Sequence, residues 1–227
     1  MISLYVEAPF AVFRIFTAGY FRPTARFMPP SSAYGLLLNI AGIEMRWDDG
    51  KSEMTLIRSS GLPGCRLALG TPAAPEVRVL YQQLHNYPVG AHRKENADRC
   101  KGSKYNIKPV KRELLCDLKA YILVDGEESF EAAIRDGLSG KVKKRYGLPF
   151  LGDNNFLPNR LDLTSPPEEI RWWERLDEDA GTEDGTVTTR MTQCIHRSDM
   201  TQTRSALYIL GKPRADVPER AWTEMYL

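Results

Sequence analysis

Apolar and polar residues alternate over residues 2–6, where Ile2, Leu4 and Val6 share one side of an extended chain. This period of two predicts a β-strand that begins near the start of the chain. Pro9 is expected to end that strand, because proline cannot donate to a sheet ladder. Further extended segments are predicted at 10–16, 53–58, 65–69, 77–84, 118–124, 186–195 and 203–210.

Two helices are predicted between these strands. Residues 33–41 are apolar nearly all round, which indicates a helix buried on most sides. Ser31 or Ser32 is its expected N-cap and Gly42 its expected end. A shorter helix is predicted over 128–136 with Ser129 as its cap. Strand–helix–strand order followed by late antiparallel strands predicts an α+β fold of the ferredoxin-like kind.

Composition adds bounds on the class of protein. The 227 residues are 42% hydrophobic, enough for a real core, and the formal net charge is only +2. The four cysteines form no CxxC pair and have no histidine at ligand spacing, so no metal and no cofactor is expected. Neither a signal peptide nor an apolar run of about 20 residues is evident, so we expect a cytoplasmic protein without a membrane partner.

Charge is sorted along the chain. Residues 91–120 hold nine Lys or Arg against four acids, whereas residues 161–185 hold nine acids against two arginines. A near-neutral total therefore hides a basic half and an acidic segment. The acidic segment is typical of a solvated connection or of a lobe that faces away from an anionic ligand.

The first candidate site lies within one predicted strand–loop–helix unit. Backbone N–H groups at a helix start bind phosphate, and arginine side chains reinforce such a site. The alternative is a well-capped core helix with ordinary surface arginines. The candidate RNA-binding residues of this unit are Arg14, Tyr20, Arg22, Arg26, Ser31, Ser32 and Tyr34.

A second candidate is the basic segment from about residue 81 to 112. Its length of about thirty residues is unusual for an idle loop, which favours a projecting hairpin or loop that lies along a phosphate backbone or wedges between bases. The alternative is a solvated surface loop. The candidate contacts are His92, Arg93, Lys94, Arg99, Lys101, Lys104 and Lys108.

The third candidate follows three consecutive cations at 143–145. The segment YGLPFLG, residues 146–152, lets the backbone approach a ligand closely at its glycines. Its aromatic side chains suit stacking on a base, although they would equally suit the core. The candidate residues are Lys144, Arg145, Tyr146 and Phe150.

Catalytic residues are harder to find. The chain has three histidines, and none stands beside a suitable acid, nucleophile or second base. His92 in the basic segment is the best candidate general base, but a lone histidine among cations more often contacts phosphate or solvent. We therefore expect no catalytic residue.

These segments together resemble a known family. Residues 4–14 (LYVEAPFAVFR), 21–24 (FRPT) and 29–37 (PPSSAYGLL) are similar to the N-terminus of the fifth family of CRISPR-associated (Cas) proteins, and YGLPFLG is similar to a later motif. The resemblance covers the first 43 residues well and 143–156 moderately. Within that family, residues 21–24 and the helix that follows them favour a type I-B-like system.

The resemblance implies a fold and a role. Members have a ferredoxin-like (RRM-like, RAMP) domain with a protruding β-hairpin thumb, here residues 1–160 with the thumb at about 81–112. Residues 161–227 would form an acidic connection and a small C-terminal β-rich extension. Members hold the 5′ handle of the CRISPR RNA in the type I surveillance complex, Cascade, and contact its backbone and large subunits. Target DNA would be a partner only indirectly.

One branch of the family is instead a metal-independent endoribonuclease that cuts precursor CRISPR RNA with a Tyr–Lys–His arrangement. This chain departs from that pattern, since Ala41 and Gly42 follow the helix core and Lys111 and Lys119 have no adjacent histidine. The resemblance therefore implies a non-catalytic RNA-binding subunit. The endonuclease, with His92 or Tyr34 in its active site, and a bridge that touches only proteins stay as alternatives.

Overall fold

The computed structural model describes residues 1–15, 17, 20–47, 50, 56–57, 61–88, 105–142, 145–176, 185–196 and 199–225. Within this part of the chain, two α-helices accompany a sheet of ten strands in the order β10-β11-β9-β5-β7-β1-β8, with β2 and β6 paired to β7 and β12 to β5. Most pairs are antiparallel, and β2 with β7 is parallel. The fold is therefore α+β.

The central strands are β1 (Ile2–Ala11), β5 (Cys65–Thr71) and β7 (Tyr105–Gly126), with β8 (Arg160–Leu163) beside β1. On the other side of β5 follow β9 (Arg171–Arg175), β11 (Arg204–Leu210) and β10 (Thr188–Cys194), while β12 (Trp222–Met225) also pairs with β5. Two 3₁₀ turns, Met200–Gln202 and Glu219–Ala221, join the late strands, and β3 (Arg46–Trp47) pairs with β4 (Leu56–Ile57) apart from the main sheet.

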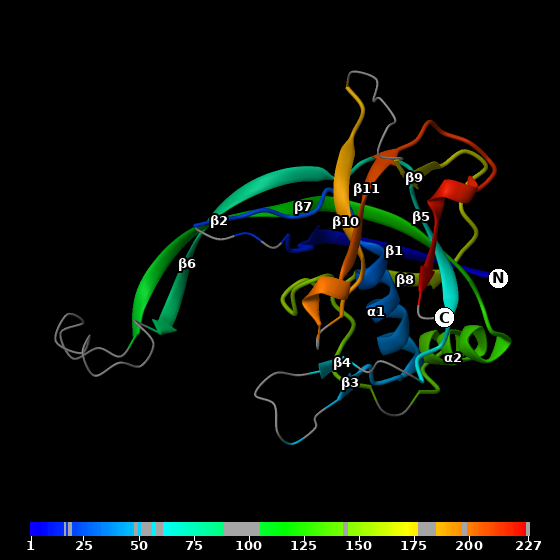
Figure 1. Cartoon of the computed structure of the whole chain (residues 1–227), viewed down its shortest axis with the longest axis horizontal. Helices are drawn as coiled ribbons and strands as arrows, with labels where there is room; N and C mark the ends of the chain where they lie inside the picture. Colours follow the sequence, from blue (N-terminus) through cyan, green and yellow to red (C-terminus); the bar gives the residue numbers. More distant parts are fainter. Residues whose placement is uncertain are drawn as a thin grey trace.

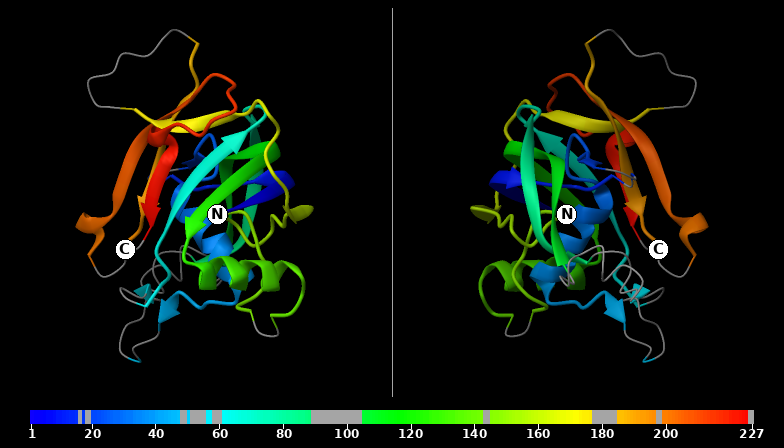
Figure 2. Two further views of the ribbon diagram at one scale, coloured as in Figure 1. Left: turned by 90° about the vertical axis from the view of Figure 1, so that its right-hand side faces the viewer. Right: turned by 90° about the vertical axis from the view of Figure 1, so that its left-hand side faces the viewer.

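Helix α1 (Pro30–Ala41) lies inside the curve of the sheet and contacts β5, β10, β12 and α2 (Glu128–Leu138), as Figures 1 and 2 show. Eight of its twelve residues are buried, which confirms the prediction from its apolar sequence. Gly42 ends the helix with φ 73°. The predicted N-caps of both helices were wrong. The N-cap is Pro29 for α1 and Glu127 for α2, and the serines lie in the first turns.

The prediction that Pro9 would break the first strand was also wrong. β1 continues to Ala11 because β8 pairs only with Leu4–Glu7, so no neighbour on that side needs a donor at Pro9. Opposite it, Asp117 has φ 54°, and pairing passes from Ala8↔Leu118 to Phe10↔Cys116 around the two residues. Ala8 and Ala11 are three residues apart and both are buried, so the side of the strand that faces the core changes between them.

The predicted projecting segment contains a long β-hairpin. β6 (Glu76–Pro88) and β7 pair from Glu76↔Cys116 to Pro88↔Tyr105, well beyond the helices (Figure 1). At the root of this hairpin, β2 (Phe21–Arg22) adds a short parallel strand on the other side of β7. The division of the chain at residue 160 stays a prediction, and in this sheet β1 pairs with β8 and β5 pairs with β9 and β12 across that point.

Candidate nucleic-acid interface

A groove of about 840 Å³ lies beside the start of α1. Residues from five separate stretches of the sequence line it, and they bring members of the first and third candidate sites together. Arg14 precedes α1, Ser31 and Ser32 begin it, and β10 closes one side. The remaining wall is the turn after residue 145, with Tyr146, Gly147, Leu148, Phe150, Gly152, Asp153, Asn154 and Leu157.

The start of α1 offers fewer backbone donors than the sequence suggested. Pro30 occupies the first turn and has no N–H, and the N–H groups of Ser32 and Ala33 donate to the Pro29 carbonyl at 2.9 and 3.0 Å. The donors that remain at this helix start are the Ser31 N–H and the hydroxyls of the two serines that line the groove. The helix start alone is a weak anion site, and arginine must supply most of the charge.

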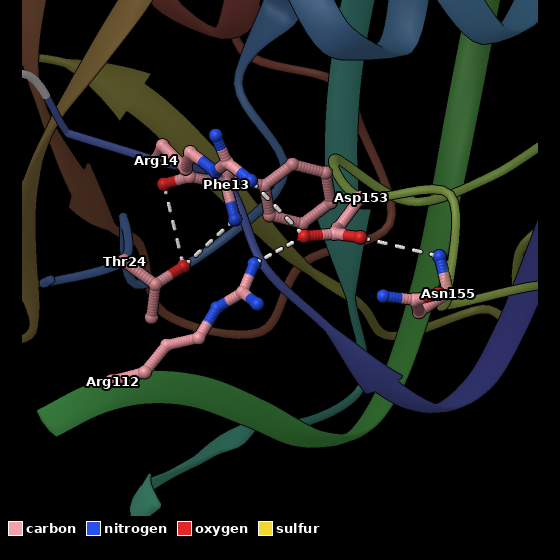
Figure 3. Close-up of polar contacts among 6 residues, drawn as sticks. All are labelled: Phe13, Arg14, Thr24, Arg112, Asp153 and Asn155. Atoms are coloured by element: carbon pink, nitrogen blue, oxygen red, sulfur yellow. Dashed lines mark hydrogen bonds and ion pairs between the residues drawn. The ribbon is translucent and has the colours of Figure 1, made fainter. Parts of the chain in front are cut away.

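That charge is held by a buried carboxylate (Figure 3). Asp153 accepts hydrogen bonds from the Arg14 guanidinium at 3.1 Å, from the Arg112 guanidinium, and from the Asn155 backbone N–H at 3.2 Å. The Asp153 and Arg112 side chains are 7% and 9% exposed, whereas that of Arg14 is 61% exposed. One carboxylate thus fixes one buried and one accessible arginine.

The charge state of this cluster follows from competing effects on Asp153. Burial alone would raise the pKa of its carboxyl, but the hydrogen bonds from Arg112, the Asn155 N–H and Arg14, with the charge of Arg112, hold that pKa below its usual value. Asp153 is therefore ionised near neutral pH. One anion with two cations leaves the cluster net positive, and the exposed Arg14 carries that charge into the groove.

Thr24 positions the backbone that carries Arg14. Its hydroxyl accepts the Phe13 N–H at 2.8 Å (Figure 3). Its own N–H donates to the Glu113 carboxylate at 3.1 Å. Thr24 and Glu113 therefore tie the segment before α1 to the hairpin strand β7. Since Arg112 lies next to Glu113 on that strand, the groove and the hairpin root share one set of polar contacts.

The turn that forms the far wall is built on close backbone approach. Gly152 has φ 77°, and a Cβ added there would lie 1.7 Å from the Val12 carbonyl oxygen. The Val12 N–H donates to the Leu151 carbonyl at 3.1 Å. On the α1 side, the Asn39 amide donates to the carbonyls of Tyr146 and Gly147 at 3.2 and 3.4 Å. The close approach at Gly152 is to the chain itself, whereas Gly147 has open space around it. Close approach of this turn to a ligand stays a prediction.

Arg46 is a lining residue that sequence reasoning missed. Its guanidinium lies over the Tyr146 ring, and its Nε donates to the Glu44 carboxylate at 3.1 Å. Arg46 and Phe150 both line the groove and also a smaller cavity of about 280 Å³ between α1 and the turn. Arg46 stands in a short strand without flanking cations, so no local charge pattern identified it.

The structure places the remaining predicted residues elsewhere. Tyr20 and Arg22 lie at the root of the hairpin, and Arg26 is exposed with its N–H donated to the Thr189 hydroxyl at 3.1 Å. Tyr34 is 1% exposed, and its hydroxyl donates to the Pro63 carbonyl at 2.7 Å, so it supports α1 from within the core. Arg145 donates to the Gly137 carbonyl at the end of α2 and is absent from the groove lining.

Most candidates of the predicted basic segment lie outside the described residues. This applies to His92, Arg93, Lys94, Arg99, Lys101 and Lys104, and also to Lys144. Lys108 is placed only by its backbone, which pairs with Leu84. These predictions stay as they were made.

The described part of the chain contains no group of three or more His, Cys, Asp or Glu residues arranged to hold a metal ion. Neither of its helices is long and apolar enough to cross a membrane. His196 accepts the Asp199 backbone N–H at its Nδ1 atom, at 3.0 Å.

The fold and the groove define an α+β protein with an exposed arginine beside the start of a buried helix. Comparison with known proteins specifies the class, since the family described as CRISPR-associated protein (Cas_Cas5) matches residues 1–223. The chain belongs to this family. No curated protein matches it.

Solved structures show the same fold at low identity. A chain of a "CRISPR RNA-guided surveillance complex" is similar with a TM-score of 0.55 and 14% identity, over 96% of this chain and 94% of that one. Another, described as "Crystal structure of Cas protein", has a TM-score of 0.51 and 12% identity, over 93% and 95%. The resemblance noted from the sequence is thereby confirmed at the level of the family.

Proposed function

We propose that this protein is a non-catalytic RNA-binding subunit of a type I CRISPR surveillance complex and that its groove holds the 5′ handle of the CRISPR RNA. The observation that carries the proposal is the exposed Arg14, fixed by the buried Asp153 between the serines of α1 and the aromatic turn. An arginine held in advance binds phosphate with less loss of side-chain freedom. Tyr146 and Phe150, 63% and 45% exposed, offer rings for unstacked bases.

The family and the fold support the wider setting of this proposal. Membership of a CRISPR-associated family and likeness to a chain of an RNA-guided surveillance complex both fit a subunit that works within a ribonucleoprotein. In that setting the core would be the ferredoxin-like (RAMP) domain, and the β6–β7 hairpin its thumb. The partners would be the backbone and large subunits in the cytoplasm, with target DNA met only through the RNA.

The non-catalytic part of the proposal rests on the residues beside the groove. Cleavage of RNA without metal needs an acid and a base at the 2′-hydroxyl. Tyr34, the tyrosine considered for that role, is buried and hydrogen-bonded to Pro63. No histidine is among the residues that line the groove in the described part of the chain. Holding RNA is thus better supported than cutting it.

Two experiments test the proposal. Purified protein is first incubated with its repeat RNA in EDTA, and intact RNA is expected. Specific cleavage that disappears in His92→Ala would replace the binding role with the endonuclease.

Affinity for the handle is then compared between Arg14→Gln and Arg214→Gln. Arg214 is also a half-exposed arginine paired with an acid, Asp216, but it lies outside the groove. Arg14→Gln should weaken binding about tenfold and flatten its salt dependence by about one charge. Equal affinities for the two variants would contradict the groove site, and would favour a bridge that contacts only proteins.

A further inference from the structure

Three strands meet at the root of the hairpin, and their registers align three side chains. Phe21 of β2 and Tyr81 of β6 both pair with Lys111 of β7. Residues directly opposite one another in a sheet project from the same face. Phe21, Lys111 and Tyr81 therefore form a row across the sheet, with a cation between two aromatic rings about 10 Å apart. We call this the root row.

The two faces of the hairpin root differ in a way that marks the root row as available. On one face, Val110 and Arg112 of β7 are 1% and 7% exposed, so β7 is covered there, although Leu80 of β6, which pairs with Arg112, is 47% exposed. On the root-row face, Phe21 and Tyr81 are 45% and 62% exposed, and Lys111 is also exposed. These rings do not complete the core, although burial of an aromatic ring is normally favourable.

Exposed aromatic rings on a projecting strand need an explanation. Val79, next to Tyr81 on the same face, is 59% exposed, so the apolar surface continues along β6. Contiguous exposed apolar surface usually marks a binding site. The question is which ligand the root row fits.

We propose that the root row is a stacking platform for bases of a single RNA strand that leaves the groove. Bases stack on aromatic side chains, and a lysine between the two rings reaches the phosphate that joins stacked nucleotides. The single-stranded ligand rests on the function proposed above. The site itself is separate from the groove, since none of its residues lines that cavity.

Charge favours RNA over a protein partner at this face. Lys111 gives the row a positive centre. Glu113, two residues further along β7 on the same face, carries a negative charge, but its carboxylate accepts the Thr24 N–H at 3.1 Å and it is not part of the row. An aromatic row with a cation at its centre matches a polyanion with exposed bases, whereas the core of a protein interface is usually depleted of charge.

The two sites are linked through β7. Arg112, adjacent to Lys111 but on the opposite face, donates to Asp153, and Asp153 lines the groove. An RNA strand that passes Arg14 would therefore have to pass around β2, which in the described part of the chain pairs only with β7, to reach the root row. The groove would grip the backbone and the root row would support the bases that follow.

The test uses the full chain and two fluorescently labelled single strands, oligo(A) and oligo(U). Tyr81→Leu and Phe21→Leu keep an apolar side chain but remove the ring, and each should weaken oligo(A) binding about tenfold. The loss should be smaller for oligo(U), because uracil stacks less strongly. Val79→Ala is the matched control, since it removes apolar surface from the same face without removing a ring, and its affinity should equal that of the wild type.

Each other outcome overturns this inference. If Tyr81→Leu binds both strands like the wild type, the root row does not stack bases. If Tyr81→Leu and Val79→Ala leave RNA affinity intact but both abolish assembly with the other complex subunits, the face docks a protein. Arg14→Gln in the same assay separates the two proposals. If Arg14→Gln weakens RNA binding and Tyr81→Leu does not, only the root-row proposal is refuted. If Tyr81→Leu weakens binding and Arg14→Gln does not, only the groove proposal is refuted.

Discussion

The buried pair of Asp153 and Arg112 predicts a large effect from a small change. Asp153→Asn keeps the size of the side chain and one acceptor oxygen but removes the charge. The Arg112 side chain, 9% exposed, then remains buried without its anion. Removing one partner of a buried pair costs about 3–5 kcal/mol, and the retained acceptor favours the lower end, about 3 kcal/mol. For a chain of this size that corresponds to a fall of about 6–12 °C in Tm.

Urea and thermal unfolding followed by circular dichroism measure the effect. Arg14→Gln is the matched control, because it removes the exposed partner of the same carboxylate and should cost about 0.5 kcal/mol. The double variant Asp153→Leu with Arg112→Met should restore most of the stability, since apolar replacement of a buried pair is often neutral. If Asp153→Asn costs no more than Arg14→Gln, the argument from burial is wrong.

The same variant has a predictable pH dependence. The pKa of Asp153 is lower in the folded protein than its usual value. Its ionised form therefore stabilises the fold at every pH above that usual value, and the contribution disappears as the pH falls through the folded pKa. The difference in stability between wild type and Asp153→Asn should be constant from pH 6 to 8 and shrink below about pH 4. A difference that stays constant down to pH 2 would contradict this.

Two further changes test the packing behind the groove. Gly152→Ala places a Cβ 1.7 Å from the Val12 oxygen at positive φ and should destabilise the protein by more than about 3 kcal/mol, whereas Gly147→Ala, at φ 75° in open space, should cost only about 1 kcal/mol; equal melting temperatures would refute the clash. Tyr34→Phe removes the hydrogen bond to Pro63 and should cost about 1 kcal/mol in urea unfolding while leaving RNA affinity unchanged; weaker RNA binding at unchanged stability would instead return Tyr34 to the site.

Parts of this fold could be predicted because they depend on local pattern. The apolar run of α1 and the glycine at its end are visible in the sequence, and both hold in the structure. The start of α1 was predicted incorrectly because the serines are preferred caps, whereas Pro30 is also stable at the first helical position. The phase change at Pro9 depends on which strand lies beside it, and that partner comes more than a hundred residues later.

The site was predictable only in pieces. Arg14, the two serines, Tyr146 and Phe150 were each identified locally, but their meeting depends on contacts across the whole chain. Asp153 carried a signal that was not used: it is the only acid in the basic stretch 141–160. A lone acid among cations is where a structural ion pair is expected.

The position of β1 has a consequence for how the protein forms in the cell. This strand precedes both of its neighbours in the sheet, which are residues 115–124 of β7 and residues 160–163 of β8. Such distant pairing closes long loops and makes folding slow. During synthesis β1 stays unpaired until the residues of β7, more than a hundred positions later, have been made. The groove depends on equally distant contacts, since Asp153 and Thr192 line it together with Arg14, so it forms only after those later segments exist.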